Sequence, residues 1–110
     1  MITYQDFDKI EIHTGTILEA KDFPKARKPA YQLLIDFGAE IGVKKTSAQI
    51  TARYTKEELI GKRVMAVTNF PTKQIADFMS EVLILGAVAP DGVVTLLTTD
   101  KEVENGYRIS

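Results

Sequence analysis

Apolar and polar residues alternate along three stretches in the first third of the chain. The alternation runs through residues 10–14, resumes after Gly15 in residues 16–20, and appears again in residues 31–37. A period of two puts every other side chain on the same face, which is typical of β-strands with one buried face. The pattern predicts a long first strand with a bend or bulge at Gly15, followed by a second strand.

Two prolines and four basic residues occupy the stretch between these strands, residues 21–29. Proline cannot donate to a strand ladder, so this stretch is expected to form an exposed basic loop. A shorter third strand is predicted at residues 41–47, weakened by Gly42. Within it, alternation sends the adjacent Lys44 and Lys45 to opposite faces of the sheet.

A short helix is predicted after the third strand. Thr55 and Glu58 match the capping-box pattern, and Gly61 is placed to end the helix in a left-handed conformation. An extension of this helix back through residues 48–54 is also compatible with the pattern. The helix would then separate the third strand from the fourth.

In the second half of the chain, the pattern predicts two or three more strands. Residues 63–70 form a mostly apolar run that Pro71 ends. Residues 81–89 and 93–99 flank Pro90-Asp91-Gly92, a sequence that favours a tight turn and therefore a hairpin.

Five strands with one helix between the third and the fourth is the order of an OB-fold, an all-β Greek-key barrel. An SH3-like barrel and a small β-sandwich also fit the periodicity. With 110 residues, of which 45% are hydrophobic, the chain suffices for one core, so residues 1–110 are predicted to form a single domain with short N- and C-terminal extensions.

Charge is spread unevenly along a chain whose formal net charge is only -1. Residues 1–75 carry a balance of +3 and residues 76–110 a balance of -4. A nearly neutral molecule lacks the broad positive field that drives indiscriminate binding to nucleic acid, so any such binding must be local.

The chain contains no cysteine, which excludes a disulfide framework and a thiolate metal site and fits a reducing cytoplasm. Neither an export signal nor a segment long enough to cross a bilayer is visible, so we expect a cytoplasmic protein without membrane insertion. His13 is the sole histidine and the carboxylates form no catalytic pair. We therefore predict no catalytic residues, no metal, no cofactor and no enzymatic activity.

Three blocks of sequence, KIEIHTGTI at residues 9–17, YTKEELIGKRV at 54–64 and NFPTKQIADFMSEVL at 69–83, resemble the tRNA-binding-domain family. That family occurs free-standing, at the end of methionyl-tRNA synthetases and in EMAP-II-like cytokine precursors. Within it, the chain looks most like the CsaA-type export chaperones. The motif residues of this resemblance are Asn69, Pro71, Ser80 and Glu81.

The resemblance implies an OB-fold homodimer that binds unfolded preprotein segments, with an export motor subunit and tRNA as further candidate partners. The expected dimer elements are residues 2–7 and 103–110. His13, Gln74 and Asp77 depart from the family pattern and lower the positive charge at the nucleic-acid face.

Two sets of side chains are candidates for binding. Apolar residues in predicted loops or beside prolines and charges are less easily buried and would line a peptide pocket; they are Phe23, Phe70, Phe78 and Met79. Basic residues would track a phosphate backbone, with an aromatic ring as a stacking platform; they are Lys21, Lys25, Arg27, Lys28, Lys44, Lys45, Arg53 and Lys73. A solvated charged rim is the alternative reading of the basic set.

Overall fold

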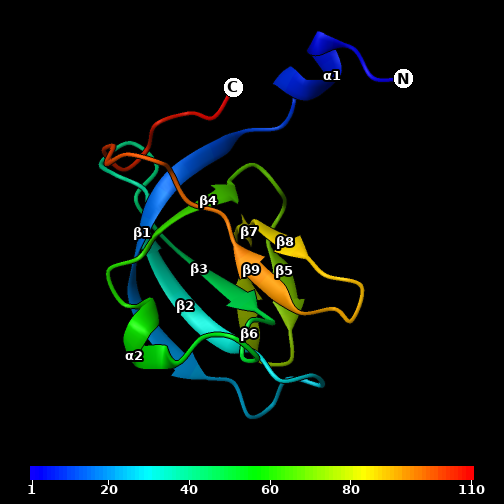
Figure 1. Ribbon diagram of the computed structural model, residues 1–110, viewed down its shortest axis with the longest axis vertical. Coiled ribbons are helices and arrows are strands. Elements are labelled where there is room, and N and C mark those ends of the chain that lie inside the picture. Colours follow the sequence, from blue (N-terminus) through cyan, green and yellow to red (C-terminus); the bar gives the residue numbers. More distant parts are fainter.

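A five-stranded antiparallel sheet forms the centre of the computed structural model, which describes residues 1–110 (Figure 1). The strand order is β3-β2-β1-β4-β7. The strands are β1 (Ile12–Asp22), β2 (Tyr31–Asp36), β3 (Val43–Ala48), β4 (Arg63–Val67) and β7 (Leu83–Ile84). The sheet curls into a nearly closed barrel with α2 (Lys56–Leu59) between β3 and β4, which confirms the predicted all-β OB-fold.

Side chains from the inner face of the sheet fill the barrel. The core includes Ile17 from β1, Leu33 and Ile35 from β2, Val64 from β4 and Leu59 from α2, all at most 2% exposed. The alternation of the sequence therefore corresponds to alternate burial in β2. Burying an aliphatic side chain of this size contributes about 1.5–3 kcal/mol each.

The barrel closes where the free edge of β3 meets residues 80–82. The Glu81 N–H donates to the Lys45 carbonyl at 2.8 Å, and the Lys45 N–H donates to the Glu81 carboxylate at 3.0 Å. Two residues further along β3, the Ser47 N–H donates to the Ser80 hydroxyl at 3.1 Å. Side chains thus satisfy an edge that would otherwise expose unpaired backbone groups. Two of the four motif residues, Ser80 and Glu81, hold the barrel shut.

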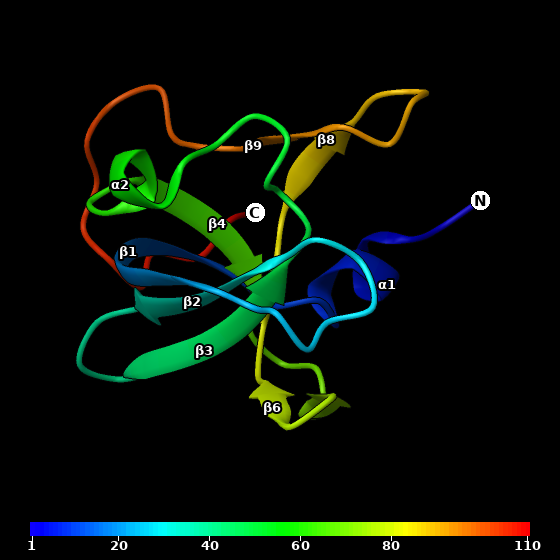
Figure 2. The same ribbon diagram turned by 90° about the horizontal axis from the view of Figure 1, so that it is seen from below.

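Two short hairpins extend from the barrel. One consists of β5 (Lys73–Ile75) and β6 (Phe78–Ser80), and the other of β8 (Gly86–Val88) and β9 (Val94–Leu96). Figure 2 shows β6 and β8 on opposite sides of the barrel when it is viewed from below. The β8-β9 hairpin turns at Gly92, whose φ is +88°, which confirms the turn predicted there.

Both ends of the chain lie beside β1. Residues 106–109 pair with the part of β1 that β2 leaves free: the Thr14 N–H donates to the Tyr107 carbonyl at 3.0 Å, and the Ile109 N–H donates to the Ile12 carbonyl at 2.8 Å. At the other end, α1 (Tyr4–Asp8) projects beyond the barrel (Figure 1). β1 is therefore the strand around which both termini are organised.

Several predicted details of the sheet and helix are wrong. The register of β1 shifts between Ile17 and Glu19, not at Gly15. Gly15 is needed for close packing, because a Cβ there would lie 2.7 Å from Ile35 Cγ2. The helix α2 does not extend back through residues 48–54, where β3 ends and a turn follows. The capping box is confirmed, since Thr55 accepts from the Glu58 N–H and Glu58 from the Thr55 N–H.

The sequence also left two elements unpredicted, α1 and the β5-β6 hairpin. The hairpin turns at Ala76, whose φ of 53° is unusual for a residue other than glycine, so the sequence carries no turn signal there. None of the helices is long and apolar enough to span a membrane.

Candidate binding surfaces

An apolar groove runs between the two hairpins. Its volume is about 1010 Å³, and its lining comes from the end of β3, from residues 70–75 and from residues 80–88, with Val94 of β9. Several large side chains along it are open to solvent: Phe70 is 55% exposed, Leu83 49% and Val88 69%. Clustered exposed apolar surface of this kind marks an interaction site.

Of the four predicted peptide-binding residues, only one lines this groove. Phe70 lines the groove, together with the motif residue Pro71. Phe78 and Met79 lie on β6 outside the groove lining, Met79 with 41% of its surface exposed. The exposure predicted for Phe23 is wrong, because Phe23 is only 5% exposed and its ring packs on that of Phe78 at 5.4 Å.

The contact between these rings fixes the basic loop against the β5-β6 hairpin. A salt bridge of 2.8 Å between Lys25 and Asp77 joins the same two segments. The hydrogen bond from Lys25 lowers the pKa of the Asp77 carboxyl, and the hydrogen bond to Asp77 raises the pKa of the Lys25 amine. Asp77, one of the departures from the family pattern, thus has a structural partner. As both groups are exposed, screening keeps their contribution to stability small.

The predicted basic residues do not gather on one surface. Lys21 and Lys45 lie on the outer face of the sheet, where the register places Lys21 opposite Gln32 and Lys45 opposite Leu34. Lys45 is exposed, and its amine lies 5.6 Å from the centre of the Phe78 ring. Lys44 is half-buried on the other face of β3, as alternation predicts.

The other basic residues have separate surroundings. Arg27 and Lys28 are exposed in the loop between β1 and β2, and Lys73 lines the apolar groove. Arg53 donates to the Thr95 hydroxyl at 2.7 Å and so lies beside β9. The outer face of the sheet therefore carries Lys21 and the Lys45–Phe78 contact, and the other predicted cations are not shown to join them there.

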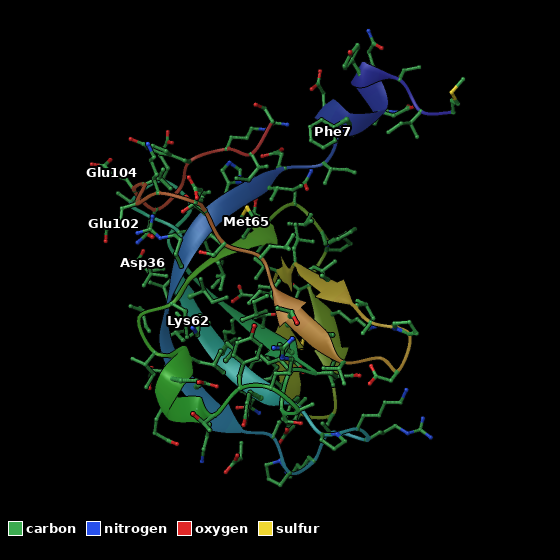
Figure 3. The ribbon with its side chains drawn as sticks, viewed as in Figure 1. Phe7, Asp36, Lys62, Met65, Glu102 and Glu104 are labelled. Atoms are coloured by element: carbon green, nitrogen blue, oxygen red, sulfur yellow. The ribbon has the colours of Figure 1, made fainter.

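Two acidic residues near the C-terminus lie away from the groove. Glu102 and Glu104 lie near Asp36 on the side of the molecule remote from β8 and β9 (Figure 3). The neighbouring Asn105 is close to the turn after β2, since a Cβ on Gly38 would lie 3.1 Å from the Asn105 carbonyl oxygen.

Asn69 has a role that the sequence did not reveal. Its side-chain amide donates to the Lys9 carbonyl at 2.8 Å, and its side-chain oxygen accepts from the Glu11 N–H at 3.0 Å. His13 also has a structural partner, since its Nδ1 lies 2.9 Å from the Thr68 hydroxyl. No group of three or more His, Cys, Asp or Glu side chains is arranged to hold a metal ion. Asn69 and His13 therefore hold the start of β1 and the residues before it against the segment that follows β4.

The comparisons with known proteins agree with this architecture. The family model of the putative tRNA-binding domain matches residues 12–108. This chain belongs to that family. Its groove, outer face and N-terminal segment are therefore features built on a tRNA-binding domain.

Two solved structures of chaperone CsaA resemble the whole chain. The protein from Picrophilus torridus is 58% identical with a TM-score of 0.93, and both chains are covered completely. The protein from Bacillus anthracis is 49% identical with a TM-score of 0.95, over 100% of this chain and 99% of that one.

Methionine–tRNA ligases are also related, for example that of Methanoregula boonei, 38% identical over 109 residues. This match covers 99% of the present chain and 16% of the ligase. The match to the enzyme from Methanocaldococcus jannaschii, 33% identical, covers 15% of that ligase. The chain thus spans about a sixth of these relatives.

Proposed function

We propose that this chain is a non-enzymatic, homodimeric, cytoplasmic chaperone that holds unfolded preprotein segments before export. The observation that carries this proposal is the apolar groove, which is open, large and lined by exposed Phe70, Leu83 and Val88. An extended apolar segment would bury these side chains. The full-length similarity to structures named as CsaA chaperones supports the same function.

The groove suits clients of varied sequence. Ten of its 19 lining residues are hydrophobic, with a single large ring at Phe70, and Lys73 and Glu81 are its charged members. Such a surface selects for apolar character and not for a specific order of side chains. Phe78, supported from beneath by Phe23, and Met79 would provide a second apolar contact on the β5-β6 hairpin. An export motor subunit is the further partner that this function implies.

The test is a titration of the protein against a labelled unfolded peptide, followed by fluorescence anisotropy, with labelled tRNA titrated in parallel. We expect micromolar peptide binding that added salt barely weakens, because the contact is mainly apolar. A polar peptide of the same length is the matched control. Equal binding of both peptides, or none, would contradict the proposed function.

Binding of tRNA is the second candidate function, and the outer face of the sheet favours it. Lys21 and Lys45 are exposed there, and the half-buried Phe78 ring next to Lys45 offers a stacking platform for a base. The match to the putative tRNA-binding domain family supports this function as well. Phosphate contacts of this kind are electrostatic and therefore weaken strongly with salt.

Replacing one lysine of a neighbouring pair tests the tRNA surface. We expect Lys45→Ala to weaken tRNA binding about fivefold to tenfold and to reduce the slope of log K against log salt by about 1, because one phosphate contact is lost. Lys44→Ala is the matched control, since Lys44 lies half-buried on the opposite face of β3. Equal losses in both variants would remove the outer face as the site.

A further inference from the structure

The chain contains two asparagines, Asn69 and Asn105, and only the second precedes a glycine. An asparagine followed by glycine is chemically labile, because glycine has no side chain to hinder attack of its backbone nitrogen on the asparagine side chain. The residue after Asn69 is Phe70, whose side chain hinders that attack. Asn105 and Gly106 are therefore the pair at which the chain can react with itself.

The reaction needs no enzyme and no cofactor. The Gly106 nitrogen loses its proton and bonds to Cγ of Asn105, which closes a succinimide ring. The Cγ–Nδ2 bond breaks, and ammonia leaves with the proton. Water then opens the ring at either carbonyl. Opening at Cγ gives aspartate, and opening at the main-chain carbonyl gives isoaspartate, in which the former side chain becomes part of the main chain.

In the folded chain, hydrogen bonds to β1 hold both reacting groups. The C-terminal segment runs beside β1 (Figure 1), and the Gly106 N–H donates to the Thr14 carbonyl at 2.7 Å. The attacking nitrogen is thus engaged through the proton that it must lose. The Asn105 side-chain oxygen accepts from the Thr16 hydroxyl at 2.7 Å, which holds the amide against β1. Ring closure therefore cannot proceed while the Gly106 bond is in place.

Thr14 fastens this segment on both sides of Asn105. Its hydroxyl donates to the Glu104 carbonyl at 2.7 Å and accepts from the Tyr107 N–H at 3.0 Å. Its backbone N–H donates to the Tyr107 carbonyl at 3.0 Å, and its carbonyl accepts from Gly106. Thr14 is only 1% exposed, so water does not compete for these groups. The segment opens when this set of bonds breaks together.

We propose that Asn105 is a site of spontaneous deamidation, and that release of residues 104–107 from β1 controls its rate. None of the side chains of residues 104–107 belongs to the buried core of the barrel. The segment can therefore open at a lower free energy than the barrel unfolds. The closed fold protects Asn105, and each opening frees the Gly106 nitrogen to react.

The aspartate product fits the closed fold. It keeps the length of the main chain and places a carboxylate in a crevice of about 580 Å³ that Arg63 also lines. Arg63 lies opposite Thr16, on β4, and its Nε and Nη1 are buried without a hydrogen-bond partner. Glu102 and Glu104 line the same crevice but form no salt bridge with it. A carboxylate at position 105 would supply the acceptor that these nitrogens lack.

The isoaspartate product does not fit, because it adds a methylene group to the main chain at a crowded turn. Gly106 has a φ of +86°, and a Cβ on it would lie 2.6 Å from the Phe37 carbonyl oxygen. The longer main chain cannot remake its bonds to Thr14 on both sides of this turn. The backbone groups of Thr14 then lose their partners, which lowers the stability of the closed segment.

Peptide mapping measures the reaction, because trypsin releases residues 102–108 as one peptide and Asn69 lies in another, residues 64–73. The protein is kept in mildly alkaline buffer, once folded and once unfolded in guanidinium chloride. We expect deamidation of Asn105 to be at least about tenfold faster in the unfolded chain, while Asn69 stays intact. Equal rates in the two states, or a stable Asn105 in the unfolded chain, would overturn the proposal.

Two threonine variants distinguish local opening from global unfolding. Thr14→Val loses both hydroxyl bonds to the segment, and deamidation in the folded protein should become about tenfold faster. Thr46→Val is the matched control, since Thr46 is also 1% exposed but its hydroxyl bonds to residues 80 and 82. We expect this variant to deamidate at the wild-type rate. Equal acceleration in both would mean that the reaction follows global unfolding.

Hydrogen exchange reports the same opening without any substitution. The factor by which the fold slows exchange of the Gly106 amide should match, within about threefold, the factor by which it slows deamidation. A much larger protection from exchange than from deamidation would show that the ring closes in the closed segment, and the proposed control by opening would be wrong.

The fate of the two products is tested by urea unfolding. Asn105→Asp copies the aspartate product, and its unfolding midpoint should equal or exceed that of the wild type. Aged chains that carry isoaspartate, separated by chromatography, should have a lower midpoint. A loss in Asn105→Asp as large as that in the isoaspartate chains would overturn the pairing with Arg63.

Discussion

Phe70→Ala should weaken the binding of an unfolded apolar peptide by about 10-fold to 100-fold. The ring lines the apolar groove and is 55% exposed in the free protein, so a bound segment would bury surface that water now covers. Burial of a phenylalanine side chain contributes about 1.5–3 kcal/mol, which corresponds to that range of affinity. Because the ring is outside the core, the free energy of unfolding should stay nearly unchanged.

Two further variants make this result specific. Ile60→Ala removes a side chain that is also 55% exposed but lies outside the groove, and peptide binding should be unaffected. Met79→Ala decides between the groove and the β5-β6 hairpin as the main contact. A larger loss for Met79→Ala than for Phe70→Ala, measured by peptide anisotropy, would move the site to the hairpin.

Gly106→Ala is expected to lower the free energy of unfolding by about 3 kcal/mol. The φ of Gly106 is +86°, a conformation that costs an alanine about 1–2 kcal/mol. In addition, a Cβ at this position would lie 2.6 Å from the Phe37 carbonyl oxygen, so the backbone must move, at a further cost of about 1–3 kcal/mol. The loss is large for a domain whose total stability is about 5–15 kcal/mol.

Gly42→Ala separates the two causes. Gly42 has the same φ of +86°, but a Cβ there would meet no atom within 4 Å. Urea unfolding should therefore show a loss of only about 1–2 kcal/mol for this variant. Equal losses for both glycines would mean that the contact with Phe37 costs nothing.

The sequence predicted the elements that have strong local signals. Alternation located β1 and β2, Thr55 and Glu58 located α2, and Gly92 located the β8-β9 turn. In each case the signal lies in adjacent residues, which is where periodicity and capping rules apply. The order of these elements favoured an OB-fold but left an SH3-like barrel and a small β-sandwich open, and the family resemblance decided between them.

The missed features depend on contacts between distant residues. Phe23 lies in a loop of prolines and lysines, and only the folded chain brings Phe78 over it. The hydrogen bonds that hold the N-terminal segment to the barrel join residues 58 to 100 positions apart along the sequence. A single sequence does not show such pairs, so the groove and the role of Asn69 emerged only from the structure.

The pairing of the C-terminal segment with β1 also orders events during synthesis. The Tyr107 N–H donates to the Thr14 hydroxyl across 93 positions of sequence, and Arg108 holds the backbone of Asp8 across 100. The part of β1 at residues 12–14 therefore lacks one of its two neighbours until residues 106–109 have left the ribosomal tunnel. The hydrogen bond from Arg108 to the N-terminal segment forms at the same late moment. Until then, the unpaired backbone groups at Ile12 and Thr14 are open to pairing with another chain.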